Sequence, residues 1–372
     1  MALFNSTSSF LGIDIGTSSI KLVEIVDRKK RLELTTYAEA NLPNLLIGAS
    51  DADAKNAIDK TANTISQMIE KSGATSDLVV AALPSTIVFS TVLTLPDLAD
   101  NEMEKAVRFA AQNVVPSDLD EMVLGWSRVA SQPHMETDEP KSLAGKIAKE
   151  APIAGINEKK IPVFLTAAPE NIVARYIEAL NKINLKIRAL EVETFPLVRS
   201  LFSSPTDSMC IVDLGALATT FHIIDAGTPR VSHTIEYGGH DMTKAIASSL
   251  NISEHEAEEQ KVGHGLSNEA PGATKNAIEG SLQTIIEKAK TLLRLYQEKA
   301  NRPIKKAVLI GGGANLKNIA TYWAKELGQA TTIGNPWRGM SAPNELERKL
   351  TEIGPNYSVA VGLALRGVNN VK

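Results

Sequence analysis

A four-residue pattern occurs twice in this chain, about half the chain length apart. Residues 13–16 read Ile-Asp-Ile-Gly and residues 212–215 read Val-Asp-Leu-Gly, which places the two aspartates 199 positions apart in a chain of 372 residues. At both places an apolar run leads into a short turn, and a second apolar run leads away from it. Two copies of one supersecondary unit indicate a duplicated architecture. The chain is therefore predicted to form two related halves, each with a β-hairpin that carries an aspartate beside its tip.

The first hairpin, residues 10–26, has a tip suited to an anionic ligand. Gly16 accommodates positive φ and lets a ligand approach the backbone, and three hydroxyl residues follow it at 17–19. Hydroxyls and turn N–H groups together can bind anionic oxygens. Asp14 ends a buried strand, where an unpaired carboxylate is costly, so it needs a cation, a metal or several donors. The tip indicates phosphate bound with Mg²⁺; an aspartate that only caps its own turn is the alternative.

The composition is that of an ordinary globular protein and excludes several functions. With 43% hydrophobic residues, the chain can bury more than one core. A net charge of −4 gives no field that attracts nucleic acid or anionic lipid. The single cysteine, Cys210, excludes an internal disulfide, and the six histidines have no metal-ligand spacing. Neither a signal peptide nor an apolar run of the ~18 residues of a membrane span occurs. We expect a cytoplasmic protein that binds no nucleic acid and reaches a membrane only through a partner or a surface.

The first half predicts an α/β lobe that a smaller unit interrupts. The lobe begins with the hairpin, a strand at 31–40, a helix at 51–71 that stops at Gly73, and a strand at 78–83. The smaller unit is expected to contain strands at 86–95, 121–130 and 161–168 and helices at 100–115 and from 169. Its polar segment 131–160 is expected to be a loop. A strand at 186–190 and a helix at 193–202 return to the lobe.

The second half repeats the hairpin and then becomes mainly helical. Strands are expected at 209–225 and 230–237, and helices at 242–250, from 253 and at 277–300. Ser253 and Glu256 have the spacing of a capping box, whereas 267–274 is expected to lack regular structure. A buried strand at 307–310 ends in three glycines, and Asn315 is expected to cap a helix that runs to 326. The last helix, 357–366, contains small residues that predict close packing against another helix.

Three glycine-bearing turns predict a nucleotide site. Two of them, at 14–16 and 213–215, carry acids, and the third is the triple glycine at 311–313. In a cleft between two α/β halves, the hairpin tips would bind phosphates from opposite sides and the acids would hold Mg²⁺ through its waters. The glycines would let an adenine or ribose lie against bare backbone. Neither a Gly-x-Ser-x-Gly elbow nor a P-loop lysine pattern indicates another chemistry.

These motifs resemble those of a known superfamily. The three turns are similar to the phosphate-one, phosphate-two and adenosine motifs of the actin, Hsp70 and sugar-kinase fold, and residues 193–200 and 354–364 resemble its two connecting helices. Within that fold the chain resembles the PilM family of type IV pilus assembly proteins and, after it, the FtsA family of cell-division proteins. The likeness to PilM lies in residues 10–24, 191–195, 237–239 and 257–261. Because the sequence ends at 372, soon after the second connecting helix, we expect no FtsA-type membrane tail, which favours PilM.

The resemblance implies an actin-like, two-lobed α/β fold of duplicated, ribonuclease H-like cores with an inserted α+β subdomain of the FtsA type. The first lobe would comprise residues 1–83, completed by 184–205 and 354–372. The inserted subdomain would comprise 84–183. The second lobe would comprise 206–353 and include a helical insertion at 238–300.

The resemblance also implies roles for individual residues. Asp14 and Asp213 would lie at Mg²⁺, and Asp213 and Glu193 would be catalytic, with Glu193 orienting the attacking water. The residues expected to bind ATP or ADP are Gly16, Thr17, Ser18, Lys21 and Gly215 at the phosphates and Gly239, Glu258, Lys261, Gly312 and Gly313 at the ribose and adenine. A solvated helix lysine is the alternative for Lys261, and a helix N-terminal acid is the alternative for Glu193.

One departure from the family pattern bears on catalysis. Leu217 and Ala218 stand where the family usually has hydroxyls, so fewer side chains can stabilise a γ-phosphate transition state. We therefore expect nucleotide binding with slow hydrolysis or none.

The resemblance to PilM implies an ATP-binding scaffold rather than a metabolic enzyme. Such a scaffold would bind the N-terminal segment of the inner-membrane protein PilN, contact other pilus assembly proteins and lie at the inner face of the cell membrane, with self-association left open. The inserted unit is the expected partner surface. The alternatives are a small-molecule kinase of the same fold, which would need a general base beside a substrate pocket, and an FtsA-like cell-division protein.

Overall fold

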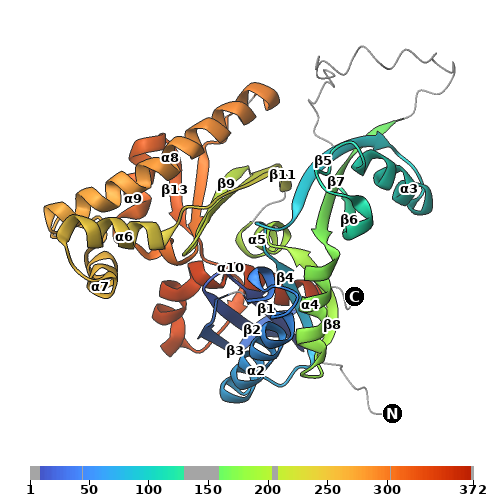
Figure 1. Cartoon of the computed structure of the whole chain (residues 1–372), viewed down its shortest axis with the longest axis horizontal. Coiled ribbons are helices and arrows are strands. Elements are labelled where there is room, and N and C mark those ends of the chain that lie inside the picture. Colours follow the sequence, from blue (N-terminus) through green and yellow to red (C-terminus); the bar gives the residue numbers. More distant parts are fainter. Residues whose placement is uncertain (1–8, 44, 130–158, 203–207, 302, 370–372) are drawn as a thin grey trace.

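The first lobe is built on a mixed six-stranded sheet. The computed structural model describes residues 9–43, 45–129, 159–202, 208–301 and 303–369 (Figure 1). The sheet has the order β14-β3-β2-β1-β4-β8. Its strands are β1 (Ser9–Ile15), β2 (Ser19–Arg28), β3 (Arg31–Asn41), β4 (Leu78–Leu83), β8 (Lys186–Val192) and β14 (Met340–Ser341). The first three form an antiparallel meander, whereas β4 runs parallel to β1 and β8 parallel to β4.

The second lobe repeats this arrangement. Its sheet has the order β11-β10-β9-β12-β13. The strands are β9 (Met209–Leu214), β10 (Thr219–Asp225), β11 (Thr228–Ile235), β12 (Lys306–Ile310) and β13 (Ala330–Ile333). An antiparallel meander again adjoins two parallel strands, so β9, β10, β11, β12 and β13 correspond to β1, β2, β3, β4 and β8. The predicted duplication and the actin-like α/β fold are confirmed.

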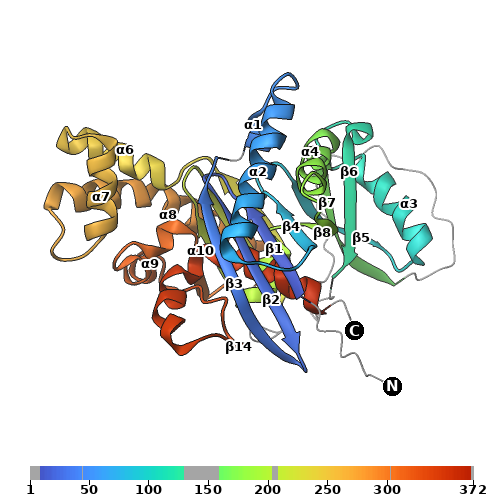
Figure 2. The ribbon, with the colours of Figure 1, turned by 90° about the horizontal axis from the view of Figure 1, so that it is seen from below.

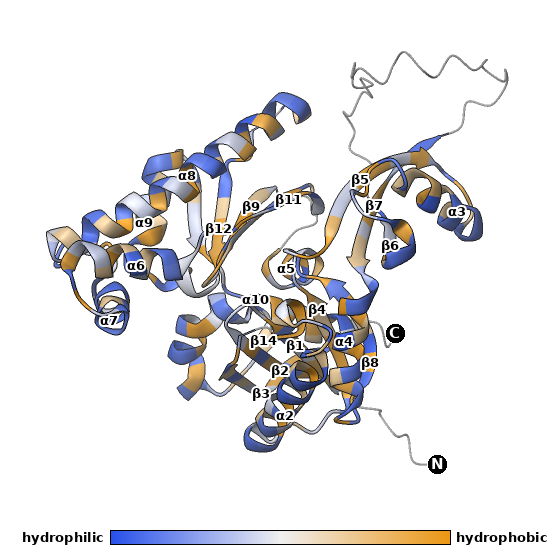
Figure 3. Ribbon diagram, viewed as in Figure 1, coloured by the Kyte–Doolittle hydropathy of each residue, from blue (hydrophilic) through white to orange (hydrophobic). Residues whose placement is uncertain are grey.

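Helices cover both faces of the two sheets. On the first sheet, α1 (Leu45–Gly48), α2 (Ala54–Ser72) and α4 (Glu170–Asn181) enclose one core. On the second sheet, α6 (Gly239–Leu250), α7 (Glu254–His264), α8 (Gly272–Ala300) and α9 (Ile319–Leu327) enclose another. The remaining faces meet α5 (Thr194–Leu201) and α10 (Glu347–Asn369), which lie between the sheets (Figures 1 and 2). Apolar residues gather along these central elements, whereas the outer helix faces are polar (Figure 3).

The inserted unit has a separate three-stranded sheet. Its elements are β5 (Phe89–Pro96), α3 (Asp100–Ala111), β6 (Met122–Arg128) and β7 (Lys160–Pro169), with the antiparallel order β5-β7-β6. The expected loop at 131–160 lies almost wholly outside the described residues. Helix α4, which follows β7, packs on the core of the first lobe through Ile172 and Tyr176. The lobe limits given above stay a prediction.

Three local expectations were wrong. The last helix begins at Glu347 rather than 357 and continues through Pro355, because packing between the two sheets stabilises a turn that the Gly-Pro pair alone disfavours. Asn315 ends a 3₁₀ helix (Gly312–Asn315), and α9 begins only after Asn318. The segment 267–274 is partly helical because α8 starts at Gly272, directly after Pro271.

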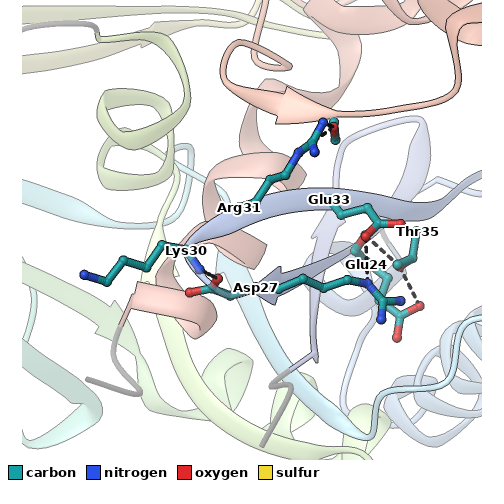
Figure 4. Close-up of polar contacts among 8 residues, drawn as sticks. Glu24, Asp27, Lys30, Arg31, Glu33 and Thr35 are labelled. Atoms are coloured by element: carbon teal, nitrogen blue, oxygen red, sulfur yellow. Dashed lines mark hydrogen bonds and ion pairs between the residues drawn. The ribbon is translucent and has the colours of Figure 1, made fainter. Parts of the chain in front are cut away.

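The turn between β2 and β3 is fixed by polar contacts far from the first hairpin tip (Figure 4). Lys29 and Lys30 both have positive φ, and the Lys30 N–H donates to Asp27 Oδ1 at 2.6 Å. Arg31 donates to Ser341 Oγ on β14 at 2.7 and 3.1 Å. Asp27 therefore caps this turn, which explains the acid that ends the apolar run of β2.

The connecting helices α5 and α10 approach so closely that glycine is required where they cross. A Cβ on Gly362 would lie 2.0 Å from the Pro196 carbonyl oxygen. We expect Gly362→Ala to lower the free energy of unfolding by about 1–3 kcal/mol, because the added methyl group forces the helices apart. Urea unfolding would measure this. Gly280→Ala in α8 is the control, because nothing lies within 4 Å of its added Cβ, and it is expected to be neutral or stabilising by up to about 1 kcal/mol. Equal unfolding midpoints for the two variants would contradict the prediction.

A buried histidine joins the second sheet to α5. The Nδ1 atom of His222 lies 3.1 Å from Thr194 Oγ1 and 3.2 Å from Ser232 Oγ, and its Nε2 atom has no hydrogen-bond partner among the described residues. Burial lowers the pKa of His222 to about 4. Its ordinary pKa is about 6.5, so between pH 6.5 and 4 the unfolded chain binds a proton that the native chain does not. Stability is therefore lost as the pH falls through this window, by up to about 3 kcal/mol.

The variant His222→Asn tests this pH dependence. The free energy of unfolding of both proteins would be measured in urea from pH 7 to 4.5. Because asparagine does not titrate, the difference in stability between the wild type and the variant is expected to shrink toward low pH. Parallel pH profiles would show that His222 does not take up this proton.

Candidate functional site

A cavity of about 370 Å³ lies between the two lobes, where the hairpin tips and the end of β12 meet. Every residue for which the sequence predicted a role lines it. These residues are Asp14, Gly16, Thr17, Ser18, Lys21, Glu193, Asp213, Gly215, Gly239, Glu258, Lys261, Gly312 and Gly313. The structure thus brings together side chains from β1, β2, β9, α6, α7 and the segments that follow β8 and β12. Their roles stay a prediction.

The first hairpin tip is a tight turn that holds a lysine. The Gly16 N–H donates to the Ser19 carbonyl at 3.0 Å. Gly16 does not use the positive φ that a glycine allows; a Cβ there would lie 3.2 Å from the Ser19 carbonyl oxygen, so close packing within the turn favours glycine. The Lys21 ammonium donates to Ser19 Oγ at 2.8 Å and lies 3.8 Å from Glu39 Oε1.

The second hairpin tip closes in the same way but offers fewer polar side chains. The Gly215 N–H donates to the Ala218 carbonyl at 3.0 Å, matching the bond that closes the first tip. The carbonyls of Gly215 and Ala216 accept the first N–H groups of α6, from Gly239 at 2.9 Å and His240 at 2.8 Å. The Leu217 side chain is about half exposed. The two tips are therefore alike in backbone and unlike in side chains.

The carboxyl groups of Asp14, Glu193 and Asp213 line the cavity. Burial, together with the charges of Asp14 and Asp213, raises the pKa of Glu193 to about 8. Burial and the charge of Asp14 raise the pKa of Asp213 to about 6, and burial also raises that of Asp14, with Lys21 opposing. The backbone N–H of Ser85 donates to Glu193 Oε2 at 2.9 Å, so Glu193 is oriented by the segment after β4 rather than by its own helix.

Asp14 and Asp213 are the candidate acids for holding Mg²⁺ through its waters. In the part of the chain that the structure describes, no three His, Cys, Asp or Glu side chains lie close enough together to hold a metal ion by themselves. Mg²⁺ keeps several waters and is usually held by one or two carboxylates together with substrate phosphates. Asp14 and Asp213 fit that pattern, in which phosphate oxygens and water complete the coordination.

Helix α7 contributes to the cavity a buried lysine with three acceptors. Lys261 Nζ donates to the Gly239 carbonyl and to Thr243 Oγ1, both at 2.8 Å, and lies 2.7 Å from Glu258 Oε2. Lys261 is 8% exposed, which excludes the alternative of a solvated helix lysine. Burial acts to raise the pKa of Glu258, but hydrogen bonds from Lys261 and Thr243 outweigh it and lower that pKa.

The triple glycine places bare backbone in the cavity beside Asp213. Gly311 has a φ of +78°, and a Cβ there would lie 2.3 Å from Asp213 Oδ1. Gly313 is also restricted, because its Cβ would lie 2.7 Å from the Leu214 side chain. Nothing lies within 4 Å of a Cβ on Gly312, which lines the open cavity. A flat ring can therefore approach this backbone without meeting a side chain at Gly312.

Several lining residues were not predicted from the sequence. They are Glu39 beside Lys21, Thr220 on β10, and Asn315, which donates to Asn356 on α10 at 3.3 Å. Two further residues hold the predicted ones in place: Ser85 donates to Glu193, and Thr243 accepts from Lys261. Only Thr220 had a local signal, because it follows the second tip as Lys21 follows the first. The others depend on tertiary contacts.

None of the helices that the structure describes contains a stretch able to span a bilayer.

Comparisons with known proteins agree with the fold. A solved PilM–PilN type IV pilus biogenesis complex matches with 28% identity and a TM-score of 0.76, covering 96% of this chain and 98% of that one. MreB5 of Spiroplasma citri bound to ADP matches with 14% identity and a TM-score of 0.52, covering 98% of both chains. The latter likeness concerns the fold alone.

The curated relatives are cell-division proteins. FtsA of Streptococcus pneumoniae serotype 2 is 23% identical over 267 residues, which cover 69% of this chain and 56% of that protein. FtsA of Enterococcus faecalis is 21% identical over 282 residues, or 70% of this chain and 58% of that protein. The chain thus spans little more than half the length of these relatives.

The family assignment rests on a match along nearly the whole chain. The model of the type IV pilus assembly protein PilM matches residues 12–150 and 152–368. That match includes both hairpin tips, the inserted unit, the triple glycine and both connecting helices. The chain therefore belongs to the PilM family of type IV pilus assembly proteins and has their actin-like fold.

Proposed function

We propose that this protein binds ATP or ADP with Mg²⁺ and couples the bound nucleotide to recognition of the N-terminal segment of a PilN-type membrane protein in type IV pilus assembly. The observation that carries the proposal is the convergence of all the predicted site residues on one cavity between the lobes. Its volume of about 370 Å³ is within the range of small-molecule sites. The similar solved complex contains both PilM and PilN, which supports the choice of partner.

The nucleotide would lie with its phosphates between the hairpin tips. Lys21, Thr17 and Ser18 would bind phosphate oxygens from one side, and the N–H groups of the second tip would bind from the other. Mg²⁺ would neutralise phosphate charge, held near Asp14 and Asp213. The ribose and adenine would lie toward Glu258, Lys261 and Gly312, which also line the cavity.

Hydrolysis is proposed to be slow. Glu193 is the candidate for orienting water, but burial and the charges of Asp14 and Asp213 raise its pKa to about 8, so it is mainly protonated at neutral pH before Mg²⁺ binds. A protonated carboxyl cannot accept a proton from water. The second tip also lacks hydroxyls at 216–218 that could stabilise developing charge on a phosphate. Both features favour a nucleotide-dependent scaffold over a rapid enzyme.

Two contacts link the cavity to the inserted unit. The chain leaves β4 through Pro84 and Thr86, which line the cavity, and enters β5 of the inserted unit at Phe89. Phe164 on β7 packs edge-to-face against Phe195 on α5, with ring centroids 5.1 Å apart, two residues after Glu193. A nucleotide that moves Glu193 or the 84–86 segment would therefore move the inserted unit, which we propose as the partner surface. Docking there would bring this protein to the inner face of the cell membrane.

Titration of nucleotide and peptide tests the proposal. ATP and ADP would be titrated into the full chain by calorimetry, and a synthetic N-terminal PilN peptide would be titrated with and without each nucleotide while phosphate release is followed. We expect nucleotide binding, slow release, and peptide affinity that differs between ATP and ADP. No ATP binding would contradict the nucleotide assignment, and no peptide binding in any nucleotide state would contradict the partner. Rapid turnover that requires a sugar or another small substrate would favour a kinase instead.

A further inference from the structure

Glu39, on β3, lies against the lysine that is proposed to bind phosphate. Ser19 Oγ donates to Glu39 Oε1 at 2.9 Å and accepts from Lys21 Nζ at 2.8 Å, so the three side chains form a short chain of hydrogen bonds. The Lys21 ammonium is 3.8 Å from the same carboxylate oxygen. All three residues line the cavity. In this arrangement the positive charge of Lys21 already has a carboxylate partner.

We propose that Glu39 is the counter-charge that holds Lys21 in the absence of nucleotide and that phosphate must displace. This inference rests on the proposed nucleotide site and adds a residue that determines its affinity. Glu39 positions Lys21 and contacts no reacting atom. The negative charge of Glu39 repels phosphate and pairs with the Lys21 ammonium. It therefore lowers the affinity for a nucleotide in proportion to the number of its phosphates, and it keeps nucleotide binding reversible.

A bulge in β3 is what brings Glu39 to Lys21. Near the β2–β3 turn Ile25 is opposite Leu34, but beyond it Glu24 is opposite Thr36, so Thr35 is an extra residue in β3. The shift places Glu39 opposite Lys21. Without it Ala38 would be opposite Lys21, and Glu39 would point to the other face of the sheet.

Buried Glu24 fixes this bulge. Thr35 Oγ1 donates to the Glu24 carbonyl at 3.1 Å and to Glu24 Oε2 at 3.0 Å, and Figure 4 shows the two side chains together. Glu24 Oε1 also accepts from the N–H groups of Thr75 at 3.2 Å and Ser76 at 2.9 Å, which precede β4. The bulge is thus fixed to a second strand of the sheet, so the position of Glu39 is a built feature of the lobe.

The partial exposure of Glu39 allows the Lys21–Glu39 pair to separate. Glu39 also lines a second cavity of about 410 Å³ on the outer side of β3, together with residues of α2 and Tyr357 on α10. Its side chain is 36% exposed, whereas that of Lys21 is 14% exposed. Water in the second cavity can therefore hydrate the Glu39 carboxylate once phosphate takes its place at Lys21, which avoids leaving a buried, unpaired charge.

The variant Glu39→Gln tests the proposal, because it removes the charge and keeps an oxygen that can accept from Ser19. Adenosine, ADP and ATP would be titrated into the full chain by calorimetry. We expect adenosine affinity to be unchanged and ATP affinity to rise about three- to tenfold, with ADP between them, as for a partly exposed pair of charges. A residue that acted only on the fold would change all three affinities alike.

Two further variants separate charge from structure. In a protein that already carries Lys21→Gln, the Glu39→Gln change is expected to raise ATP affinity by less than about half as much. The reason is that Glu39 then no longer has the Lys21 ammonium as its partner. Glu33→Gln is the matched control: it is also on β3 and pairs with Arg28 at 2.7 Å, but at the far end of the strand (Figure 4). It is expected to change no nucleotide affinity.

The outcomes distinguish this inference from the proposed function. Failure of the wild type to bind ATP would contradict the proposed nucleotide site itself. Wild-type binding with unchanged or weaker ATP affinity in Glu39→Gln would overturn the role of Glu39 alone. An equal gain in the Lys21→Gln background would also overturn it, since the effect would then not pass through Lys21.

Discussion

Replacing Asp14 by asparagine is expected to weaken binding of Mg²⁺-ATP more than about tenfold while leaving the protein at least as stable. Asp14 is buried beside the first tip, and burial raises its pKa because few groups stabilise the charged form. The asparagine amide has the same shape, and it removes the cost of burying a carboxylate in the nucleotide-free protein. In the complex it also removes a negative charge that would hold Mg²⁺ through its waters. Affinity and stability should therefore respond differently to one substitution.

The measurement is calorimetric titration of ATP with Mg²⁺ and with a chelator, together with urea unfolding. Without metal, Asp14→Asn is expected to bind ATP at least as well as the wild type, because a repulsive charge has been removed. Asp27→Asn is the control, on the same hairpin and at the opposite end of β2, where the side chain caps a turn. Wild-type affinity for Mg²⁺-ATP in Asp14→Asn would show that the first tip has been misinterpreted.

The repeated pattern around Asp14 and Asp213 was enough to predict the architecture. A strand, a turn with an acid and a second strand can be recognised locally, and their recurrence predicted two lobes of equal topology. The equivalent strand orders of the two sheets confirm this. The positions of the tips in one cavity then follow from topology, because equivalent strand ends face the same cleft in both lobes. Residues on those ends, such as Lys21 and Gly215, could be named from sequence for this reason.

Residues whose position depends on register could not be named. Counting back from the turn at Lys29 and Lys30 places Ala38 opposite Lys21, and only the extra residue at Thr35 brings Glu39 there. The bulge in turn depends on a buried Glu24 that contacts a segment 51 residues further along the chain. Nothing within β2 or β3 alone indicates it. A single inserted residue thus decides whether a carboxylate lies in the site or on the opposite face.

The glycines of the site are required for a reason that the sequence does not reveal. Gly16 could accommodate positive φ, but among the tip and triple-glycine positions only Gly311 has it. At Gly16 and Gly215 the restriction is the approach of a carbonyl oxygen, at 3.2 Å from Ser19 and 2.8 Å from Ala218, to the place of a Cβ. Similarly, the Gly354–Pro355 pair was interpreted as a boundary, whereas contacts with both sheets carry α10 through it. Local propensity is outweighed wherever an element packs on two sides.

Replacing Lys261 by methionine is expected to impair the opposite end of the site and the stability of the second lobe together. The ammonium satisfies the Gly239 carbonyl, Thr243 Oγ1 and Glu258 Oε2. Methionine fills similar space without a donor, so these acceptors lose their partner, and the free energy of unfolding should fall by about 1–3 kcal/mol. The matched control is Lys290→Met, which removes a lysine from an exposed pair with Glu287 at the same sequence spacing of three. Lys290→Met should lower the free energy of unfolding by less than about 1 kcal/mol.

The nucleotide dependence of this variant distinguishes the two ends of the cavity. If Lys261 and Glu258 hold the ribose and adenine, Lys261→Met should lower the affinities for adenosine and for ATP by the same factor, about tenfold or more. Asp14→Asn, in contrast, should leave adenosine unaffected and weaken only Mg²⁺-ATP. Calorimetric titration of both ligands into both variants measures this directly. A loss for ATP alone in Lys261→Met would mean that the lysine contacts phosphate and that the nucleotide lies in the reverse orientation. Because the two tips differ so much in side chains, orientation determines which of them meets the terminal phosphate, and therefore whether the second tip can limit hydrolysis at all.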